Sequence, residues 1–230
     1  MLDALAGAEA PAPRWAEWTR AARGDYEAWT APKETPGAVK MEAVVRWLSE
    51  HLEEDAIVTN GAGNYAAFVH RYFTFKRHGT QLAPTSGSMG YGFPAAIAAS
   101  LRHPGRQVVC MAGDGCFQMT LNEFSTAVQH GAKPIVVVAN NGRYGTIRMH
   151  QERHYPGRTS GTDLANPDFA ALARAYGGHG ETVTQGGDFP AAFARAAASG
   201  VPAVIELRLD PEALSTSLTL SQARTLGEKG

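Results

Sequence analysis

The chain has 230 residues and a mass of 24.5 kDa, enough for one large domain or two small ones. Its 44% hydrophobic and 19% charged residues exclude a disordered chain, and 21 basic against 22 acidic residues leave no electrostatic footprint for nucleic acid. Two cysteines are too few for a disulfide scaffold, and no apolar run reaches the roughly 20 residues that span a bilayer. Residues 1–13 lack a signal-peptide pattern. We therefore expect a cytoplasmic protein without membrane or nucleic-acid partners.

Residues 1–37 differ in composition from the rest of the chain. They contain four of the prolines and three of the four tryptophans. The stretch 14–30 predicts a short helix with its aromatic side chains on one side. Three tryptophans are unusual in a free tail, so we expect this segment to pack on the following domain or on a domain that is absent here.

From residue 38 the pattern becomes regular, and apolar runs alternate with segments of helical periodicity. The predicted helices span 41–52, 64–73, 93–101, 121–130, 144–153, 168–176 and 189–198, and the predicted strands span 56–58, 107–112, 135–139 and 204–207. The strands are continuous apolar runs, which is typical of strands covered on both faces. The fold class is therefore α/β, with an open, mostly parallel sheet and helices on both faces.

Three special turns follow predicted strands: Gly61–Gly63, Gly113–Gly115 and Asn140–Gly142. In open parallel sheets, ligands bind beyond the carboxyl ends of the strands, so we expect these turns to face one crevice. Asp114 and Asn141 would bring hard oxygen ligands that suit Mg²⁺ or Ca²⁺, with a diphosphate completing the shell. Each of the two residues taken alone is better explained as an ordinary turn residue, whereas the pair together favours a metal site.

The pair of motifs Gly113-Asp114-Gly115 and, 27 positions after Asp114, Asn141 resembles the thiamine diphosphate motif, GDG followed by NN. The segments 86–97 and 117–124 also look like the C-terminal, diphosphate-binding domain of acetolactate synthase and related enzymes. The resemblance covers about residues 38–209. It implies thiamine diphosphate and Mg²⁺ as cofactors, and it implies a fold of the thiamine diphosphate-binding type.

The resemblance also implies roles for individual residues. Asp114, the Asn141 side chain and the backbone carbonyl of Arg143 would be the Mg²⁺ ligands. Met89 would be the apolar wedge that bends the cofactor, with the backbone at Gly87 and Met89 bonding its pyrimidine ring. The remaining cofactor contacts that it implies are Ala62, Gly63, Asn64, Tyr65, Gly113, Gly115, Cys116, Tyr144, Gly145, Thr146 and Ile147.

The chain departs from the acetolactate synthase pattern in two places. Asn64 and Tyr65 replace a glutamine and a histidine that contact the diphosphate in the family. Thr146 replaces a methionine and His150 a tryptophan, which predicts a more polar acceptor pocket, while Ile147 keeps a branched apolar residue beside the thiazolium ring. The activating glutamate of the family belongs to a separate pyrimidine-binding domain, so we assign no catalytic residue within this chain.

The leading interpretation is therefore half of an enzyme: the diphosphate- and Mg²⁺-binding part of a 2-keto acid decarboxylase or carboligase (a lyase or transferase), inactive alone and oligomeric with a pyrimidine-binding domain or subunit. The resemblance divides the chain into a remnant of a middle domain (1–37), the cofactor domain (38–210) and a C-terminal tail (211–230). Either a split-enzyme subunit or a truncated longer chain fits this division. A non-catalytic cofactor-binding or assembly module is the alternative, and a nicotinamide-dependent oxidoreductase is disfavoured by the incomplete glycine fingerprint.

Overall fold

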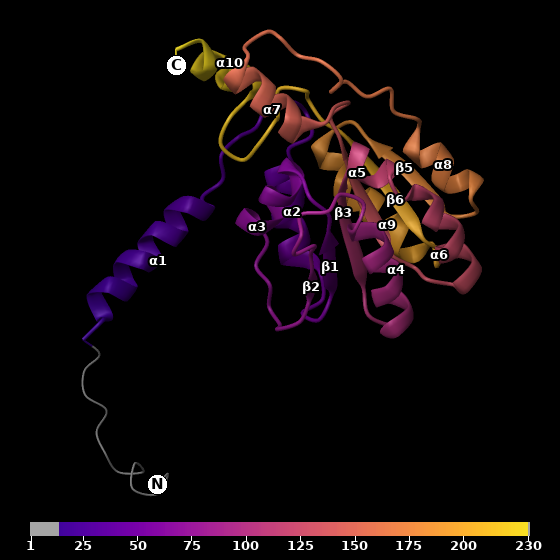
Figure 1. Ribbon diagram of the computed structural model, residues 1–230. Coiled ribbons are helices and arrows are strands. Elements are labelled where there is room, and N and C mark those ends of the chain that lie inside the picture. The colour runs from indigo at the N-terminus through magenta and orange to yellow at the C-terminus, as the bar shows by residue number, and fades with distance from the viewer. Residues whose placement is uncertain (1–13, 230) are drawn as a thin grey trace, which may run out of the picture. The chain divides into compact units, whose positions relative to one another are not determined.

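The computed structural model describes residues 14–229; residues 1–13, which include the start of the predicted N-terminal segment, and residue 230 lie outside it. The chain divides into two compact units, Met1–Pro32 and Lys33–Gly230 (Figure 1). No helix in the described part of the chain is long and apolar enough to cross a membrane.

The described part of the first unit is a single helix, α1 (Ala16–Thr30), close to the helix predicted over 14–30. Trp15, Trp18, Tyr26 and Trp29 are exposed, and their spacing places them on one side of the helix, as predicted. An exposed ion pair joins Arg23 to a glutamate one turn later.

The second unit is built on a six-stranded sheet in which every neighbouring pair of strands is parallel. Its order is β2-β1-β3-β4-β6-β5. The strands are β1 (Ile57–Asn60), β2 (Gln81–Leu82), β3 (Val108–Gly113), β4 (Ile135–Asn140), β5 (His179–Val183) and β6 (Ala203–Arg208). The predicted open parallel sheet is thus confirmed.

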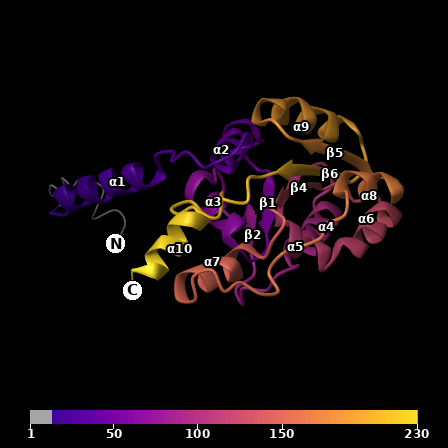
Figure 2. The same ribbon diagram turned by 90° about the horizontal axis from the view of Figure 1, so that it is seen from above.

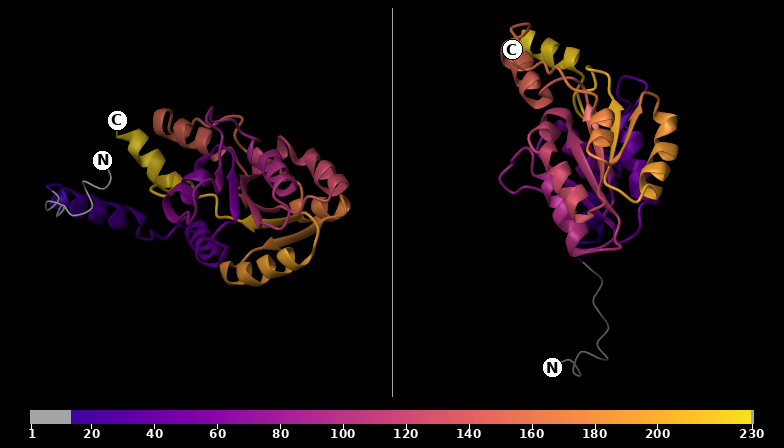
Figure 3. Two further views of the ribbon diagram at one scale, coloured as in Figure 1. Left: turned by 90° about the horizontal axis from the view of Figure 1, so that it is seen from below. Right: turned by 90° about the vertical axis from the view of Figure 1, so that its right-hand side faces the viewer.

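Helices cover both faces of the sheet, because alternate residues of each strand point to opposite sides and both sides are apolar. Helices α2 (Met41–His51), α3 (Asn64–Tyr72) and α9 (Phe189–Ala198) pack on one face. Helices α4 (Gly92–Arg102), α5 (Asp114–Gln118), α6 (Phe124–His130) and α8 (Phe169–Ala175) pack on the other. Figures 2 and 3 show the two layers on either side of the strands.

Helices α7 (Gly145–His154) and α10 (Leu220–Glu228) pack together as a third, smaller cluster. A buried ion pair between Glu152 and Arg224 joins them. The segment 211–230, which the sequence analysis treats as a tail, therefore contains a helix that is packed on the domain.

The strand order places a topological switch at β1 and β3. From β1 the chain runs outward to β2, and it then crosses back to β3 on the other side of β1. In open parallel sheets this is where ligands bind, just beyond the carboxyl ends of the strands. The turns that follow β1 and β3 flank this point.

The structure contains elements that the sequence pattern did not predict. Strand β5 lies at a sheet edge and has the polar sequence His-Gly-Glu-Thr-Val, so it lacks the apolar run of a buried strand. Strand β2 has only two residues. The helix predicted over 121–130 begins with a short 3-10 helix, Leu121–Glu123, before α6. That helix ends at Gly131, as predicted, in the left-handed conformation with φ 69°.

Candidate functional site

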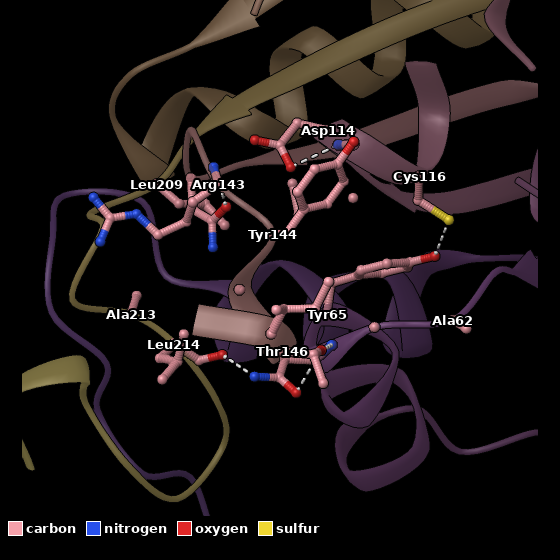
Figure 4. A pocket seen from close by; sticks show the side chains of 18 of the residues that line it. Ala62, Tyr65, Asp114, Cys116, Arg143, Tyr144, Thr146, Leu209, Ala213 and Leu214 are labelled. Carbon is pink, nitrogen blue, oxygen red and sulfur yellow. Dashed lines mark hydrogen bonds between the residues drawn. The ribbon is translucent and has the colours of Figure 1, made fainter. Parts of the chain in front are cut away.

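A cavity opens at the carboxyl ends of the central strands (Figure 4). Its empty volume is about 610 Å³, including space open to solvent. The turns after β1, β3 and β4 and the residue after β6 all contribute to its wall. Its lining residues are Met41, Ala62, Gly63, Asn64, Tyr65, Phe68, Met89, Gly113, Asp114, Gly115, Cys116, Ala139, Asn141, Arg143, Tyr144, Gly145, Thr146, Ile147, Leu209, Ala213 and Leu214.

Asp114 is the acidic residue of this cavity. It is the first residue of α5 and its side chain is only 3% exposed. Its Oδ1 accepts a hydrogen bond from the Gly115 backbone N–H at 2.8 Å, and its Oδ2 accepts one from the Gly142 N–H and one from Asn166 Nδ2, both at 2.8 Å. Burial raises the pKa of this carboxyl, and hydrogen bonds from Asn166 and from the backbone N–H groups of Gly115, Gly142 and Arg143 oppose the rise. A bound cation would therefore relieve a carboxylate that is short of charge compensation.

A buried carboxylate stabilises the turn after β4. Glu206, fully buried on β6, accepts a hydrogen bond from Asn140 Nδ2 at 2.5 Å. The Oδ1 of Asn140 in turn accepts from the Gly142 N–H at 3.1 Å. The neighbouring Asn141 side chain lines the cavity, and its Oδ1 accepts from the Arg143 N–H at 3.2 Å. This arrangement fixes the direction of the Asn140 amide and with it the path of the turn.

Tyr65 and Cys116 join helix α3, helix α5 and the loop at Gly90 on one side of the cavity. The Tyr65 hydroxyl donates to Cys116 Sγ at 3.1 Å, and the same sulfur accepts from the Gly90 N–H at 3.1 Å (Figure 4). The ring of Tyr65 covers Gly113 so closely that a Cβ there would lie 2.9 Å from it. Burial, and then the adjacent thiol, raise the pKa of Tyr65. Tyr65 is therefore a neutral hydrogen-bond donor at physiological pH.

Asn64 and Thr146 form a link across the mouth of the cavity. The Asn64 N–H donates to Thr146 Oγ1 at 3.1 Å, and that hydroxyl donates to Asn64 Oδ1 at 3.0 Å. Asn64 Nδ2 donates to the backbone carbonyl of Leu214 at 3.1 Å. The start of α3, the start of α7 and the C-terminal segment are thus tied together at the cavity.

Tyr144 places its ring directly against the backbone of α5. A Cβ built at Gly115 would lie 2.5 Å from Tyr144 Cε1 and 3.1 Å from a methyl group of Leu164. The backbone here approaches an aromatic ring more closely than any side chain at position 115 allows.

Substituting Gly115→Ala is therefore expected to push the Tyr144 ring aside and to lower the free energy of unfolding by about 1–3 kcal/mol. The matched control is Gly187→Ala, where an added methyl group meets nothing within 4 Å. Chemical denaturation of both variants measures the difference. Equal stabilities would show that the ring moves without cost.

The structure brings together nearly all the residues that the sequence analysis proposed for the site. Fifteen of them line the cavity, and Gly87 does not: it is exposed, with φ +70°, and lies outside the lining. The lining residues that the sequence analysis missed are Met41, Phe68, Ala139, Leu209, Ala213 and Leu214. Ala139 and Leu209 lie at carboxyl ends of strands, so the rule that located the three turns would have found them. Ala213 and Leu214 carry no such signal.

The donor set fits a hard divalent cation together with a phosphate ligand. Asp114 and Asn141 offer carboxylate and amide oxygens, which Mg²⁺ prefers, and Mg²⁺ needs few protein ligands when phosphate and water complete its shell. The described residues include no cluster of three or more His, Cys, Asp or Glu side chains of the kind that a transition metal requires. The Nε of Arg143, which lines the same cavity, is buried without a hydrogen-bond partner and is a spare donor.

Comparisons with known proteins agree on one family. Residues 61–207 match the family described as thiamine pyrophosphate enzyme, C-terminal TPP binding domain. The acetolactate synthase large subunit of Haemophilus influenzae is 36% identical over 157 residues, which are 65% of this chain and 27% of that protein. The corresponding subunit of Parasynechococcus marenigrum is 33% identical over 204 residues, 88% of this chain and 33% of that protein.

A solved structure shows the same fold. The thiamine diphosphate-dependent 4-hydroxybenzoylformate decarboxylase of Rhodococcus jostii RHA1 matches with a TM-score of 0.71 and 31% sequence identity. The match covers 78% of this chain and 34% of that one. The chain thus spans about a third of the length of these relatives, or less.

Proposed function

The chain belongs to the thiamine pyrophosphate enzyme family through its C-terminal TPP-binding domain, and from this we propose that it is the diphosphate- and Mg²⁺-binding half of a 2-keto acid decarboxylase or carboligase. Its relatives include synthases of acetolactate and a decarboxylase of 4-hydroxybenzoylformate, a 2-keto acid. The donor substrate is therefore proposed as a 2-keto acid.

The observation that carries this proposal is the meeting of Asp114 with the Asn140–Asn141 turn in one cavity. The Gly142 N–H bonds both the Asp114 carboxylate and the Asn140 amide, so the two motifs form one hydrogen-bonded unit. In the proposed complex Asp114, Asn141 and the Arg143 carbonyl would hold Mg²⁺, which would supply a positive charge for the diphosphate.

Thiamine diphosphate supplies an electron sink for breaking or forming the bond beside a keto group. The residues of this chain bind and orient it. Met89, Ile147 and Leu214 line the cavity with apolar surface. Helix α3 begins at the cavity, and its N-terminal end favours an anion such as the diphosphate.

Proton transfer is the part of the chemistry for which the described cavity has no group. The titratable side chains in its lining are Tyr65, Asp114, Cys116, Arg143 and Tyr144, and the lining contains no Glu, His or Lys. Asp114 is committed to three hydrogen bonds, and Tyr65 is held neutral. We therefore propose that a pyrimidine-binding domain, as a separate subunit or as another part of a longer chain, supplies a glutamate, and that the active assembly is an oligomer.

The test combines binding with turnover. Calorimetric titration of thiamine diphosphate into the full chain is expected to give saturable heat that requires Mg²⁺. Decarboxylation of a 2-keto acid is expected only after a pyrimidine-binding domain of an acetolactate synthase large subunit is joined ahead of this chain. Mg²⁺-dependent binding without turnover in the joined protein would favour a non-catalytic cofactor-binding module. Absence of binding in both forms would refute the proposal.

A further inference from the structure

Asn166 lies between α7 and α8, outside every motif of the sequence analysis, yet it contacts the acidic residue of the cavity. Its Nδ2 donates to Asp114 Oδ2 and to Asn140 Oδ1, both at 2.8 Å. Its Oδ1 accepts from Gln118 Nε2 at 2.7 Å. All the polar atoms of this amide are therefore used, and they join the two halves of the proposed metal site.

Two carboxylates, Asp114 and Glu206, fix the direction of these hydrogen bonds. An ionised carboxylate only accepts, so Asn166 must turn its NH₂ group toward Asp114 and its carbonyl toward Gln118. Glu206 likewise only accepts, so Asn140 must turn its NH₂ group toward Glu206 and its carbonyl toward Asn166. A reversal of the Asn166 amide would set oxygen against oxygen at two contacts.

This network decides which oxygen of Asp114 is open to a further partner. A carboxylate has about four acceptor positions, two on each oxygen. Gly142 and Asn166 fill both positions on Oδ2, whereas Gly115 fills one on Oδ1. Oδ1 is therefore the oxygen with fewer hydrogen bonds.

The segment that carries Asn166 is itself tied to the turn after β4. The Leu164 N–H donates to the Gly142 carbonyl at 2.8 Å, and the Tyr144 N–H donates to the Thr162 carbonyl at 2.9 Å. Arg143 and Asp163 form an isolated antiparallel bridge. The backbone hydrogen bonds of this segment and the side-chain hydrogen bonds of Asn166 thus fix the position of Asn166 next to Asp114.

We propose that Asn166 is a positioning residue for the metal ligand Asp114 and that Gln118 sets the direction of its amide. This inference rests on the proposed function, because it assigns the residues that prepare the same site for Mg²⁺. Neither residue touches the cation in the proposal. Each acts through the Asp114 carboxylate.

Two substitutions test the inference in the full chain. Asn166→Ala removes the hydrogen bonds that Asn166 donates to Asp114 and to Asn140. Gln118→Glu keeps the shape of the side chain but replaces its donor with an acceptor, so either orientation of the Asn166 amide opposes two oxygens. Simple Coulomb attraction predicts that the added charge at 118 tightens Mg²⁺ binding, whereas positioning predicts that it weakens it.

The measurement is the Mg²⁺ affinity at saturating thiamine diphosphate, by calorimetry, together with the thermal unfolding temperature without cofactor. Both variants are expected to bind Mg²⁺ roughly tenfold more weakly, the effect of losing a hydrogen bond to a charged group. Gln118→Glu is expected to lower the unfolding temperature only slightly, because residue 118 is partly exposed to solvent. Asn122→Ala and Gln129→Glu, at exposed positions, are the matched controls and are expected to change neither quantity.

If both variants bind Mg²⁺ as the wild type does, the positioning role is wrong while the proposed function stands. If the affinity falls only in step with the unfolding temperature, the network is a stabilising contact and the inference is likewise wrong. If Asn166→Ala does not fold, Gln118→Glu decides alone. Failure of the wild type itself to bind refutes the proposed function, and the inference with it.

Discussion

Substituting Asp114→Ala is expected to abolish the Mg²⁺-dependent binding of thiamine diphosphate, with a loss of roughly two orders of magnitude or more in affinity. Asp114 is the anionic side chain of the cavity lining, and a magnesium site with one or two carboxylates depends on each of them. The substitution also removes one of the two acceptors of the Gly142 N–H and leaves the Asn140 side-chain carbonyl. Calorimetry with and without Mg²⁺ measures the loss.

The control for this variant is Asp188→Ala. Asp188 precedes α9, is exposed, and makes no capping hydrogen bond with its side chain. The Asp188→Ala substitution changes the net charge of the chain by the same amount as Asp114→Ala. Equal binding by both variants would mean that the cation, if bound, is held elsewhere, and the assignment of Asp114 as a ligand would be abandoned.

The second large effect is expected from Arg224→Met, which breaks the buried ion pair between α10 and α7. Glu152 is 0% exposed and accepts from Arg224 Nε at 2.8 Å and Nη2 at 2.6 Å. Without Arg224, Glu152 keeps the hydrogen bond from the Gly157 N–H at 3.1 Å. Removal of one partner of a buried pair costs 3–5 kcal/mol, and because the Arg224 side chain is 43% exposed we expect about 3 kcal/mol.

The same pair gives a pH dependence with a defined sign. Hydrogen bonding from Arg224 lowers the pKa of Glu152 from 4.5 to about 2. A lowered pKa in the folded state adds stability above the unfolded value, and this stability is lost as the pH falls toward 2. The difference in unfolding free energy between wild type and Arg224→Met is therefore expected to be large at pH 7 and small near pH 2.

Chemical denaturation at several pH values and hydrogen exchange within α10 measure these effects. The double variant Glu152→Gln with Arg224→Met is expected to recover part of the stability, because no unpaired charge stays buried. Arg23→Met, which breaks an exposed Arg–Glu pair in α1, is the control and is expected to leave stability unchanged. A pH-independent difference would contradict the role of the Glu152 charge.

Much of the fold is predictable from the sequence because its central strands are strongly apolar. Strands β3 and β4 are fully buried, so their composition marks them without reference to the rest of the chain. Strand β5 is not predictable in this way. Its pairing with β6 along one edge lets it keep a histidine, a glutamate and a threonine, and only tertiary structure selects it as a strand.

The residues of the candidate site also differ in how far the sequence predicts them. Asp114 and Asn141 follow apolar strands in tight turns, so both pattern and chemistry point to them. Asn166 and Leu214 reach the site through contacts 52 and 150 positions apart in sequence, in irregular segments without periodicity. No local pattern encodes such a contact, because it depends on where the intervening helices place the backbone.

The strand order also has a consequence for synthesis of the chain. Strand β6, the last to leave the ribosome, lies between β4 and β5, and β5 joins the sheet only through it. Until residue 208 has emerged, the nascent chain exposes an unpaired apolar edge along β4. This edge is therefore covered only after the last of the six strands has been synthesised.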